Sequence, residues 1–250
     1  MRHTLTALLL TLTFWAQASE TIRWTSPENY RLSAELYPAG AKAVVFIHGT
    51  GGPDVRERIY ADALNSAGIT VLAVDFKTGI YRDGRDRGQH QFIPMLRSAM
   101  DQLRARGYKD IGVMGTSLGG VVTVRSKMAS AGVNARSYVA LYPNCSLYLE
   151  GGWWPNTTRE PVAPGPIMIL YGEQDEQPER TACPQLEART QHWSAEYIVY
   201  GPAHHGFDRP GATWRVPEPS SPTGSLTLQY HEAAAQDAKQ RIVRFFKETL

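Results

Sequence analysis

Cysteine is scarce in this chain, and the sequence has neither a large excess of one charge nor a long apolar run. Two cysteines among 250 residues exclude a four-thiolate zinc site and a disulfide-rich miniprotein. The 26 Lys and Arg nearly balance the 24 Asp and Glu, which argues against a nucleic-acid binder that works by bulk charge. No internal apolar run reaches the roughly 18 residues that a membrane span needs. An apolar content of 42% is ordinary for a globular protein with a sizeable core.

The first 18 residues have the pattern of a secretory signal peptide. Arg2 and His3 form a short basic start, and an apolar stretch of 11 residues follows at positions 5–15. Ala16 and Ala18 place small residues three and one before Ser19, as a signal peptidase requires. We therefore expect a mature chain of residues 19–250 that is secreted or periplasmic. The alternative is a buried first helix.

The mature chain alternates short apolar runs with longer helical patterns. The runs are residues 43–47, 69–74, 111–114, 138–142, 167–171 and 197–200. Continuous β-branched and apolar runs are typical of strands that are covered on both faces. Apolar residues at helical spacing predict a helix from Pro94 to Gly107 and a closing helix around residues 234–246. This alternation predicts an α/β fold with a mostly parallel sheet and helices on both faces.

Two further segments complete the predicted organisation. Residues 22–36 contain short alternating runs, which could form antiparallel edge strands ahead of the parallel core. Residues 209–225 are rich in Pro, Gly and Ser, so we expect a long surface loop inserted into one domain. We find no internal repeat, and we predict one domain over residues 19–250.

Ser117 stands at the centre of a G-x-S-x-G sequence, residues 115–119. A predicted strand precedes this sequence and a helical pattern, residues 118–131, follows it. That context is the one in which the motif forms a tight, strained turn that presents a nucleophilic serine. The alternative is a plain turn with a serine at a helix start. With strand and helix on either side, the nucleophile is the preferred interpretation.

An acid and a histidine follow later strands in the order that such a serine requires. Glu173, Asp175 and Glu176 come after the run 167–171, and we prefer Asp175 because it lies further into the loop. His204 and His205 come after the run 197–200, and we prefer His205 because the neighbouring glycine leaves room for its ring. The carboxyl ends of parallel strands are where ligands bind in such sheets. The predicted catalytic set is therefore a serine, an aspartate and a histidine.

The glycine-rich segment after the run 43–47 has the sequence HGTGG. Its backbone N–H groups could stabilise an oxyanion, and we choose Thr50 and Leu118 as the two donors. A phosphate loop is disfavoured because neither a Gly-Lys-Ser/Thr ending nor a dinucleotide glycine spacing is present. His48 is interpreted as a structural histidine. The seven scattered histidines do not give the spacing of metal ligands, so no metal and no cofactor are expected.

The segments FIHGTGG, GTSLGG, YGEQD and AHHGFD together resemble an α/β-hydrolase, and more narrowly the dienelactone hydrolase family. The HGFD ending is the most specific of them and favours His205 over His204. The resemblance extends from about residue 34 to the carboxyl terminus. It implies a hydrolase that acts on a small-molecule ester. Founding members of the family have a cysteine where this chain has Ser117, which argues against dienelactone itself as the substrate.

Several expectations concern the loops around this predicted site. Cys145 and Cys183 follow strands at the same end of the sheet, and in an exported protein we expect them to form a disulfide. Trp153 and Trp154 could line a substrate pocket, although simple packing is the preferred interpretation. Residues 82–87, RDGRDR, mix signs and are interpreted as a solvated loop.

Two other functions are compatible with the same residues. A non-catalytic binding protein would be expected to show a broken set of catalytic residues, whereas all three positions are filled here. A hydrolase of peptides or small amides would use the same residues. However, a chain of this length has no room for the gating domain that large peptidases of the superfamily carry. The oligomeric state and the identity of the ester do not follow from the sequence.

Overall fold

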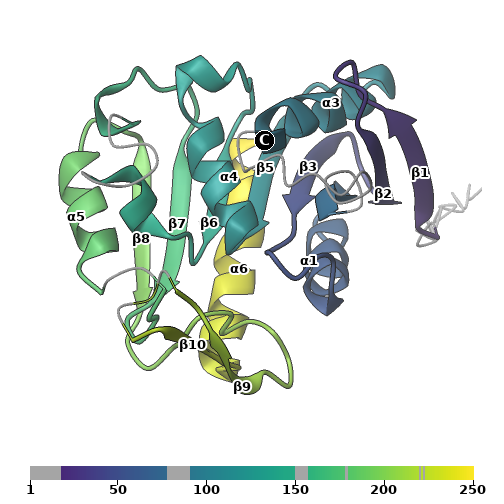
Figure 1. Ribbon diagram of the computed structural model, residues 1–250. Coiled ribbons are helices and arrows are strands. Elements are labelled where there is room, and N and C mark those ends of the chain that lie inside the picture. The colour runs from purple at the N-terminus through teal and green to yellow at the C-terminus, as the bar shows by residue number, and fades with distance from the viewer. Residues whose placement is uncertain (1–17, 78–90, 150–156, 178–179, 220, 222) are drawn as a thin grey trace, which may run out of the picture.

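The computed structural model describes residues 18–77, 91–149, 157–177, 180–219, 221 and 223–250 (Figure 1). The predicted signal peptide, the basic and acidic segment 82–87 and the tryptophans Trp153 and Trp154 lie outside these residues, apart from Ala18. None of the helices in these ranges combines the length and the hydropathy that crossing a membrane requires.

A mixed sheet forms the centre of the molecule, and its strands occur in the order β1-β2-β4-β3-β5-β6-β7-β8. The strands are β1 Glu20–Thr25, β2 Arg31–Tyr37, β3 Lys42–Ile47, β4 Ile69–Asp75, β5 Ile111–Thr116, β6 Tyr138–Leu141, β7 Ile167–Gly172 and β8 Ala195–Tyr200. The pairs β1–β2 and β2–β4 are antiparallel, and all the other pairs are parallel. Both the parallel core and the antiparallel edge were predicted from the sequence, and both are confirmed.

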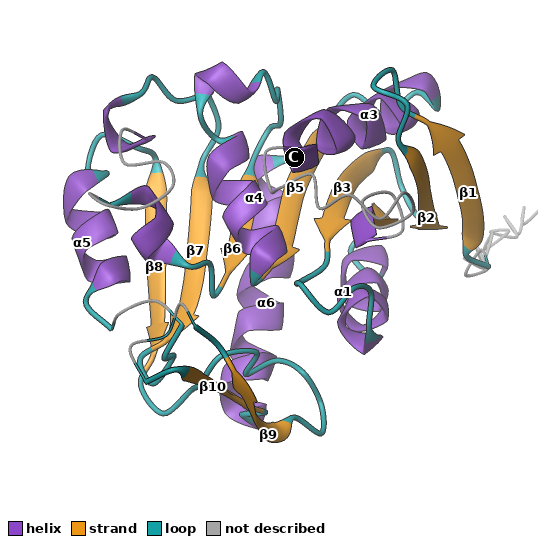
Figure 2. Ribbon diagram, viewed as in Figure 1, coloured by secondary structure: helices purple, strands orange, loops and turns teal. Residues whose placement is uncertain are grey.

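Helices cover both faces of this sheet (Figure 2). They are α1 Val55–Asn65, α3 Phe92–Ala105, α4 Leu118–Ser126, α5 Ala182–Arg189 and α6 Glu232–Thr249, with short 3₁₀ turns η2 Ala129–Ala131, η3 Cys145–Tyr148 and η4 Thr157–Arg159. Residues of α3, α4 and α5 form one buried apolar cluster with the sheet, and residues of α1 and α6 form the other. The helical pattern predicted over residues 118–131 is divided in two, because α4 ends at Ser126 and a separate 3₁₀ turn follows.

Residues 209–225 are not the irregular loop that their composition predicts. They contain β9 Thr213–Pro217, which pairs antiparallel with β10 Ser225–Gln229. This hairpin lies beyond the carboxyl ends of β7 and β8 (Figure 1). The hairpin was not predicted, because the many Pro, Gly and Ser residues of this segment outweighed two short apolar alternations, Trp214 with Val216 and Leu226 with Leu228.

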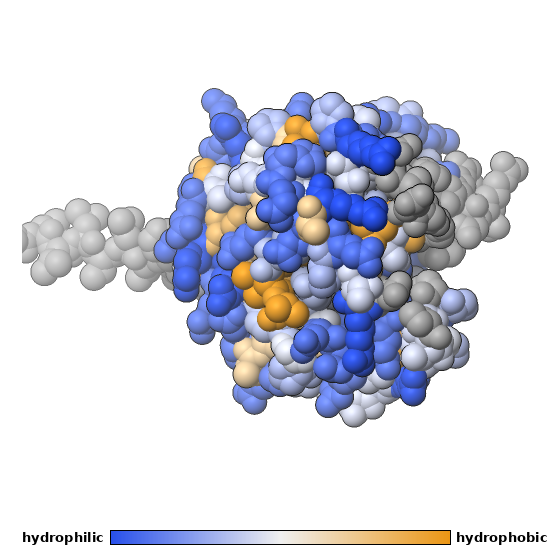
Figure 3. Space-filling view, turned by 90° about the vertical axis from the view of Figure 1, so that its left-hand side faces the viewer, coloured by the Kyte–Doolittle hydropathy of each residue, from blue (hydrophilic) through white to orange (hydrophobic). Residues whose placement is uncertain are grey.

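The β8 edge of the sheet faces the viewer in Figure 3, where the surface is mainly hydrophilic with scattered apolar spots. Val199 on β8 is a large apolar side chain that is half exposed. Single apolar residues at a surface are ordinary and do not indicate an interface.

Candidate active site

The parallel register places the carboxyl ends of five strands, β3, β5, β6, β7 and β8, at the same end of the sheet. Ile47 pairs with Gly115, and Thr116 pairs with Leu141. Further along the sheet, β7 and β8 are paired as far as Gly172. The loops that follow these strands carry the residues that the sequence singled out, so the topology places them near one another.

Ser117 occupies a sharp turn between β5 and α4. Its φ of 53° and ψ of −115° are uncommon for a residue with a side chain, and such a conformation costs about 1–3 kcal/mol. The neighbouring glycines make the turn possible. A Cβ on Gly115 would be 2.3 Å from the carbonyl carbon of Gly119, and a Cβ on Gly119 would be 2.0 Å from the Ile47 oxygen. This is the strand–turn–helix geometry predicted for the motif.

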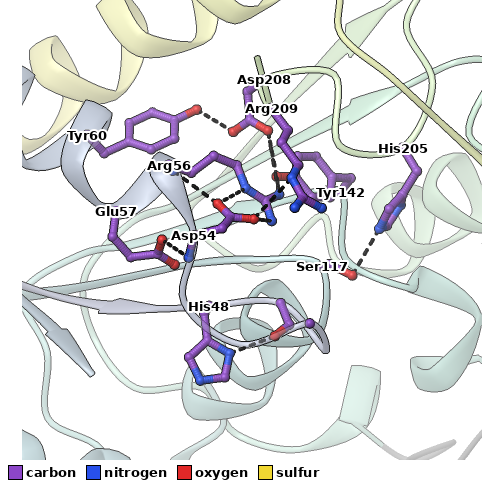
Figure 4. Close-up of polar contacts among 12 residues, drawn as sticks. His48, Asp54, Arg56, Glu57, Tyr60, Ser117, Tyr142, His205, Asp208 and Arg209 are labelled. Carbon is purple, nitrogen blue, oxygen red and sulfur yellow. Dashed lines mark hydrogen bonds and ion pairs between the residues drawn. The ribbon is translucent and has the colours of Figure 1, made fainter. Parts of the chain in front are cut away.

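His205 lies between Ser117 and Asp175. Its Nε2 is 2.9 Å from the Ser117 Oγ (Figure 4), and its Nδ1 is 2.7 Å from Asp175 Oδ2. An ionised carboxylate can only accept a hydrogen bond, so Nδ1 carries the proton and Nε2 is left as the acceptor for the serine hydroxyl. Both His205 and Asp175 are buried. The structure thus brings the three preferred residues into one hydrogen-bonded chain.

The rejected candidates lie elsewhere. Glu176 accepts a hydrogen bond from the backbone N–H of Thr227 in β10. His204 has a buried Nδ1 that has no hydrogen-bond partner among the described residues. Neither side chain bonds to Ser117.

The glycine-rich turn after β3 lies against the serine. A Cβ on Gly49 would be 3.3 Å from the Ser117 Cβ and 3.8 Å from its Oγ. In the part of the chain that the structure describes, the backbone N–H groups of Thr50 and Leu118 donate to no protein acceptor. Thr50 follows Gly49 and Leu118 follows Ser117, and unpaired N–H groups in such positions are suited to bind a negatively charged oxygen.

His48 has the structural environment that the sequence suggested. Its Nδ1 donates to the Gly49 carbonyl at 2.6 Å, and its Nε2 accepts from the N–H groups of Phe76 and Lys77 at 3.0 and 3.3 Å. Burial lowers the pKa of this imidazole, so the neutral form is favoured. His48 therefore ties the start of the glycine-rich turn to the end of β4.

A buried polar network behind His205 was not predicted. The Tyr142 ring packs edge-on against the imidazole, with 4.8 Å between the ring centroids. Its hydroxyl accepts from Arg56 Nη1 at 2.6 Å and donates to Asp208 Oδ1 at 2.7 Å (Figure 4). Tyr60 donates to the other Asp208 oxygen at 2.7 Å. Burial raises the pKa of the Tyr142 hydroxyl well above its usual value and keeps it protonated.

Two arginines offset the two carboxylates of this network, Asp54 and Asp208. Arg209 Nε lies 3.3 Å from Asp54 Oδ2, and Arg56 makes the closer contact. Its Nε and Nη2 donate to both oxygens of Asp54 at 2.9 and 2.7 Å, a two-point contact that fixes the guanidinium plane. Asp208 belongs to the HGFD segment, so the sequence held one signal for the network. Nothing in the sequence connected Arg56 to Tyr142, which lies 86 residues away along the chain.

Cys145 and Cys183 form a disulfide, as predicted, with 5.1 Å between their Cα atoms. It joins η3 to α5, the helix that follows the Asp175 loop. Within the described ranges, no three His, Cys, Asp or Glu side chains are grouped to hold a metal ion.

The mainly parallel sheet, the serine on a strained turn after β5 and the aspartate and histidine loops after β7 and β8 define an α/β-hydrolase. A model of the dienelactone hydrolase family matches residues 34–250, and the chain belongs to this family. Membership makes the protein a carboxylesterase-like hydrolase.

Solved structures share the fold at low sequence identity. A dienelactone hydrolase from Anabaena variabilis is 17% identical, with a TM-score of 0.70 over 94% of this chain and 100% of that chain. An esterase from Pyrococcus furiosus is 19% identical, with a TM-score of 0.67 over 93% of each chain. Thermogutta terrifontis esterase 2, phosphorylated by paraoxon, is 15% identical, with a TM-score of 0.65 over 94% of this chain and 95% of that chain. A search of curated proteins found no match.

Proposed function

We propose that the protein is a serine hydrolase that cleaves carboxylic esters, with Ser117, His205 and Asp175 as its catalytic residues. The observation that carries the proposal is the continuous chain from the Ser117 Oγ through both ring nitrogens of His205 to the Asp175 carboxylate. A serine hydroxyl becomes an effective nucleophile only when a positioned base removes its proton, and this chain supplies that base.

In the first half of the cycle, His205 Nε2 takes the proton of Ser117 as the Oγ attacks the ester carbonyl carbon. Asp175 accepts the hydrogen bond from Nδ1 and stabilises the imidazolium that forms. The N–H groups of Thr50 and Leu118 donate to the oxyanion of the tetrahedral intermediate. When this intermediate collapses, the C–O bond to the alcohol breaks, and Nε2 returns its proton to the departing alkoxide.

In the second half, water attacks the acyl-enzyme carbonyl while His205 removes one of its protons. Collapse of the second tetrahedral intermediate releases the carboxylic acid, and the proton on Nε2 returns to the Ser117 Oγ. The cycle needs no cofactor. The comparison proteins described as esterases support an ester as the substrate, and one of them is phosphorylated by an organophosphate.

The decisive test is Ser117→Ala. We expect kcat/KM for p-nitrophenyl acetate to fall by roughly 10⁴-fold or more, because removal of a catalytic serine leaves only binding and oxyanion stabilisation. Ser66→Ala is the matched control, since Ser66 is an exposed residue at the end of α1. An unchanged rate in Ser117→Ala would refute the mechanism.

A fluorophosphonate probe separates this enzyme from a binding protein on the same scaffold. The probe forms a covalent bond only with an activated serine, so we expect labelling at Ser117 in the parent protein and none in Ser117→Ala. Absence of labelling in the folded parent protein would favour the binding protein. An ester series with increasing acyl length, compared with matched amides, then defines the substrate.

The proposal extends to the location of the enzyme. The signal pattern of residues 1–18 supports export and a mature chain of residues 19–250. The disulfide is consistent with this location, because such bonds persist in oxidising compartments.

A further inference from the structure

The β9–β10 hairpin contacts both loops that carry the partners of Ser117. On β10, Leu228 forms a parallel backbone bridge with His205. One residue earlier, the Thr227 N–H donates to the carboxylate of Glu176 at 2.6 Å. Glu176 directly follows Asp175 in the chain. Adjacent residues of a single strand thus hold the loop of the acid and the loop of the histidine.

The Glu176 carboxylate bonds to both strands of the hairpin. One oxygen accepts from Thr227 of β10, and the other lies 3.7 Å from Arg215 Nη2 of β9. Arg215 and Thr227 are cross-strand partners. Burial by itself would raise the pKa of Glu176, but the hydrogen bonds from Thr227 and the nearby Arg215 and His204 lower it overall. The side chain is therefore a charged anchor, and only 16% of it is exposed.

Further bonds tie the hairpin to the same two loops. The Gln177 amide donates to Glu218, just beyond β9, at 3.1 Å, and the Gln177 backbone N–H donates to Asp175 Oδ1 at 2.9 Å. At the other end of the hairpin, the His231 N–H donates to the Phe207 carbonyl at 2.8 Å. The hairpin and its flanking residues therefore contact the acid loop at Glu176 and Gln177, and the histidine loop on both sides of Gly206.

The sheet alone does not fix the distance between Asp175 and His205. The pairing of β7 with β8 ends at Gly172 and Tyr200. Beyond it the Glu173 N–H donates to the Tyr200 carbonyl and the Gln174 N–H to the Ala203 carbonyl, each at 3.0 Å, but no backbone bond joins Asp175 to His205. A catalytic group that is displaced by about 1 Å can reduce the rate about 100-fold. An additional element that holds both loops is therefore of direct consequence for the rate.

We propose that Glu176 is a positioning residue, which uses the β9–β10 hairpin to fix Asp175 against His205. This inference rests on the proposed function of the three residues. Glu176 takes no part in proton transfer itself. Its carboxylate anchors the acid loop to Thr227, and the neighbouring Leu228 anchors the histidine loop, so the two loops keep one relative position.

The experiment compares Glu176→Ala and Glu176→Gln with the parent protein on p-nitrophenyl acetate. In Glu176→Ala we expect kcat to fall about tenfold with KM nearly unchanged, because the contact between Asp175 and His205 is loosened while the ester site is intact. The rate of fluorophosphonate labelling should fall in parallel. Glu176→Gln keeps an oxygen acceptor for the Thr227 N–H, so its kcat should lie within about threefold of the parent value.

Glu160→Ala is the matched control for loss of a partly buried carboxylate. Glu160 bonds to Arg125 in the last turn of α4, the end of that helix opposite to Ser117. All variants are assayed well below their measured melting temperatures. The inference is overturned if Glu176→Ala keeps the parent kcat, if Glu176→Gln is as slow as Glu176→Ala, or if Glu160→Ala is equally slow.

The outcome is separable from that for the proposed function. An inactive Ser117→Ala beside a fully active Glu176→Ala would remove the positioning role and leave the ester hydrolase in place. An active Ser117→Ala would remove both.

Discussion

Glu57 is a buried acid in the first turn of α1, beside the network that supports His205. Its carboxylate accepts a hydrogen bond from the Asp54 N–H at 2.6 Å. The Asp54 side chain in turn accepts from backbone N–H groups in the first turn of α1, so the two residues form a capping box. Burial raises the pKa of Glu57 to about 7, although the hydrogen bond from Asp54 acts in the opposite direction. The native protein therefore holds a proton that the unfolded chain releases near pH 4.5.

This difference gives a stability that falls as the pH rises. Between the unfolded pKa of 4.5 and the native pKa of about 7, the native state binds more protons than the unfolded state, so the free energy of unfolding decreases with pH. The full effect is about 3 kcal/mol. Between about pH 5 and about pH 8 we expect the parent protein to lose about 2.5 kcal/mol more stability than Glu57→Gln, because part of the effect is already lost at pH 5. Urea unfolding of both proteins at the two pH values measures it.

Glu232→Gln is the control for this experiment, because Glu232 stands in the first turn of α6 and is exposed. Its stability should follow that of the parent protein at both pH values. Parallel changes in the parent and in Glu57→Gln would contradict the assignment of the pH dependence to Glu57.

Two catalytic candidates, Ser117 and His205, could be identified from the sequence because each stands in a recognisable local motif. Ser117 has glycines at the positions where its turn approaches other backbone, and His205 stands before Gly-Phe-Asp. Arg56 and Tyr142 have no such pattern. Their contact depends on how α1 packs against the sheet, and a single sequence contains no record of that packing.

At the scale of elements, strands that are buried on both faces were the most predictable. Residues 43–47 and 167–171 are continuous apolar runs, and both became fully buried strands with boundaries within one residue of the prediction. The hairpin β9–β10 was missed because its strands have only five residues each and stand in a segment rich in Pro, Gly and Ser. Each strand has just two alternating apolar residues, and polar contacts such as that between Glu176 and Thr227 help to hold the hairpin in place.

The disulfide between η3 and α5 should contribute measurably to stability. It closes a segment of 38 residues, for which restriction of the unfolded chain predicts about 4 kcal/mol. We expect the Cys145→Ala/Cys183→Ala double variant to unfold with a free energy lower by roughly that amount. For a domain of this size, the melting temperature should fall by roughly 10 °C.

Reduction of the parent protein provides the second measurement. Alkylation without reductant should leave the mass unchanged, and alkylation after reduction should modify both cysteines. A double variant with the melting temperature of the oxidised parent would show that the bond does not stabilise the fold.

At the scale of the whole molecule, the candidate site is assembled from loops that follow β3, β5, β6, β7 and β8. Each loop contributes a part: the glycine-rich turn, Ser117, Tyr142, Asp175 and His205. The parallel sheet places these loops together at the carboxyl ends of its strands. The helices on its two faces bury the strands that support the loops. The order of the candidate catalytic residues along the chain could be predicted, because each follows one of the parallel strands. The contacts between neighbouring loops could be found only in the structure.

The predicted signal peptide and the disulfide of the folded domain can be tested together, because both depend on export. If residues 1–18 direct export, the full chain expressed in a bacterial host should yield an exported protein whose first residue is Ser19. Its two cysteines should be oxidised, whereas residues 19–250 expressed in a reducing cytosol should carry free thiols, because glutathione and thioredoxin keep thiols reduced there. Leu9→Arg, which interrupts the apolar stretch, should leave the precursor uncleaved. Amino-terminal sequencing and intact mass measure both outcomes, and an exported protein that retains Met1 would contradict cleavage after Ala18.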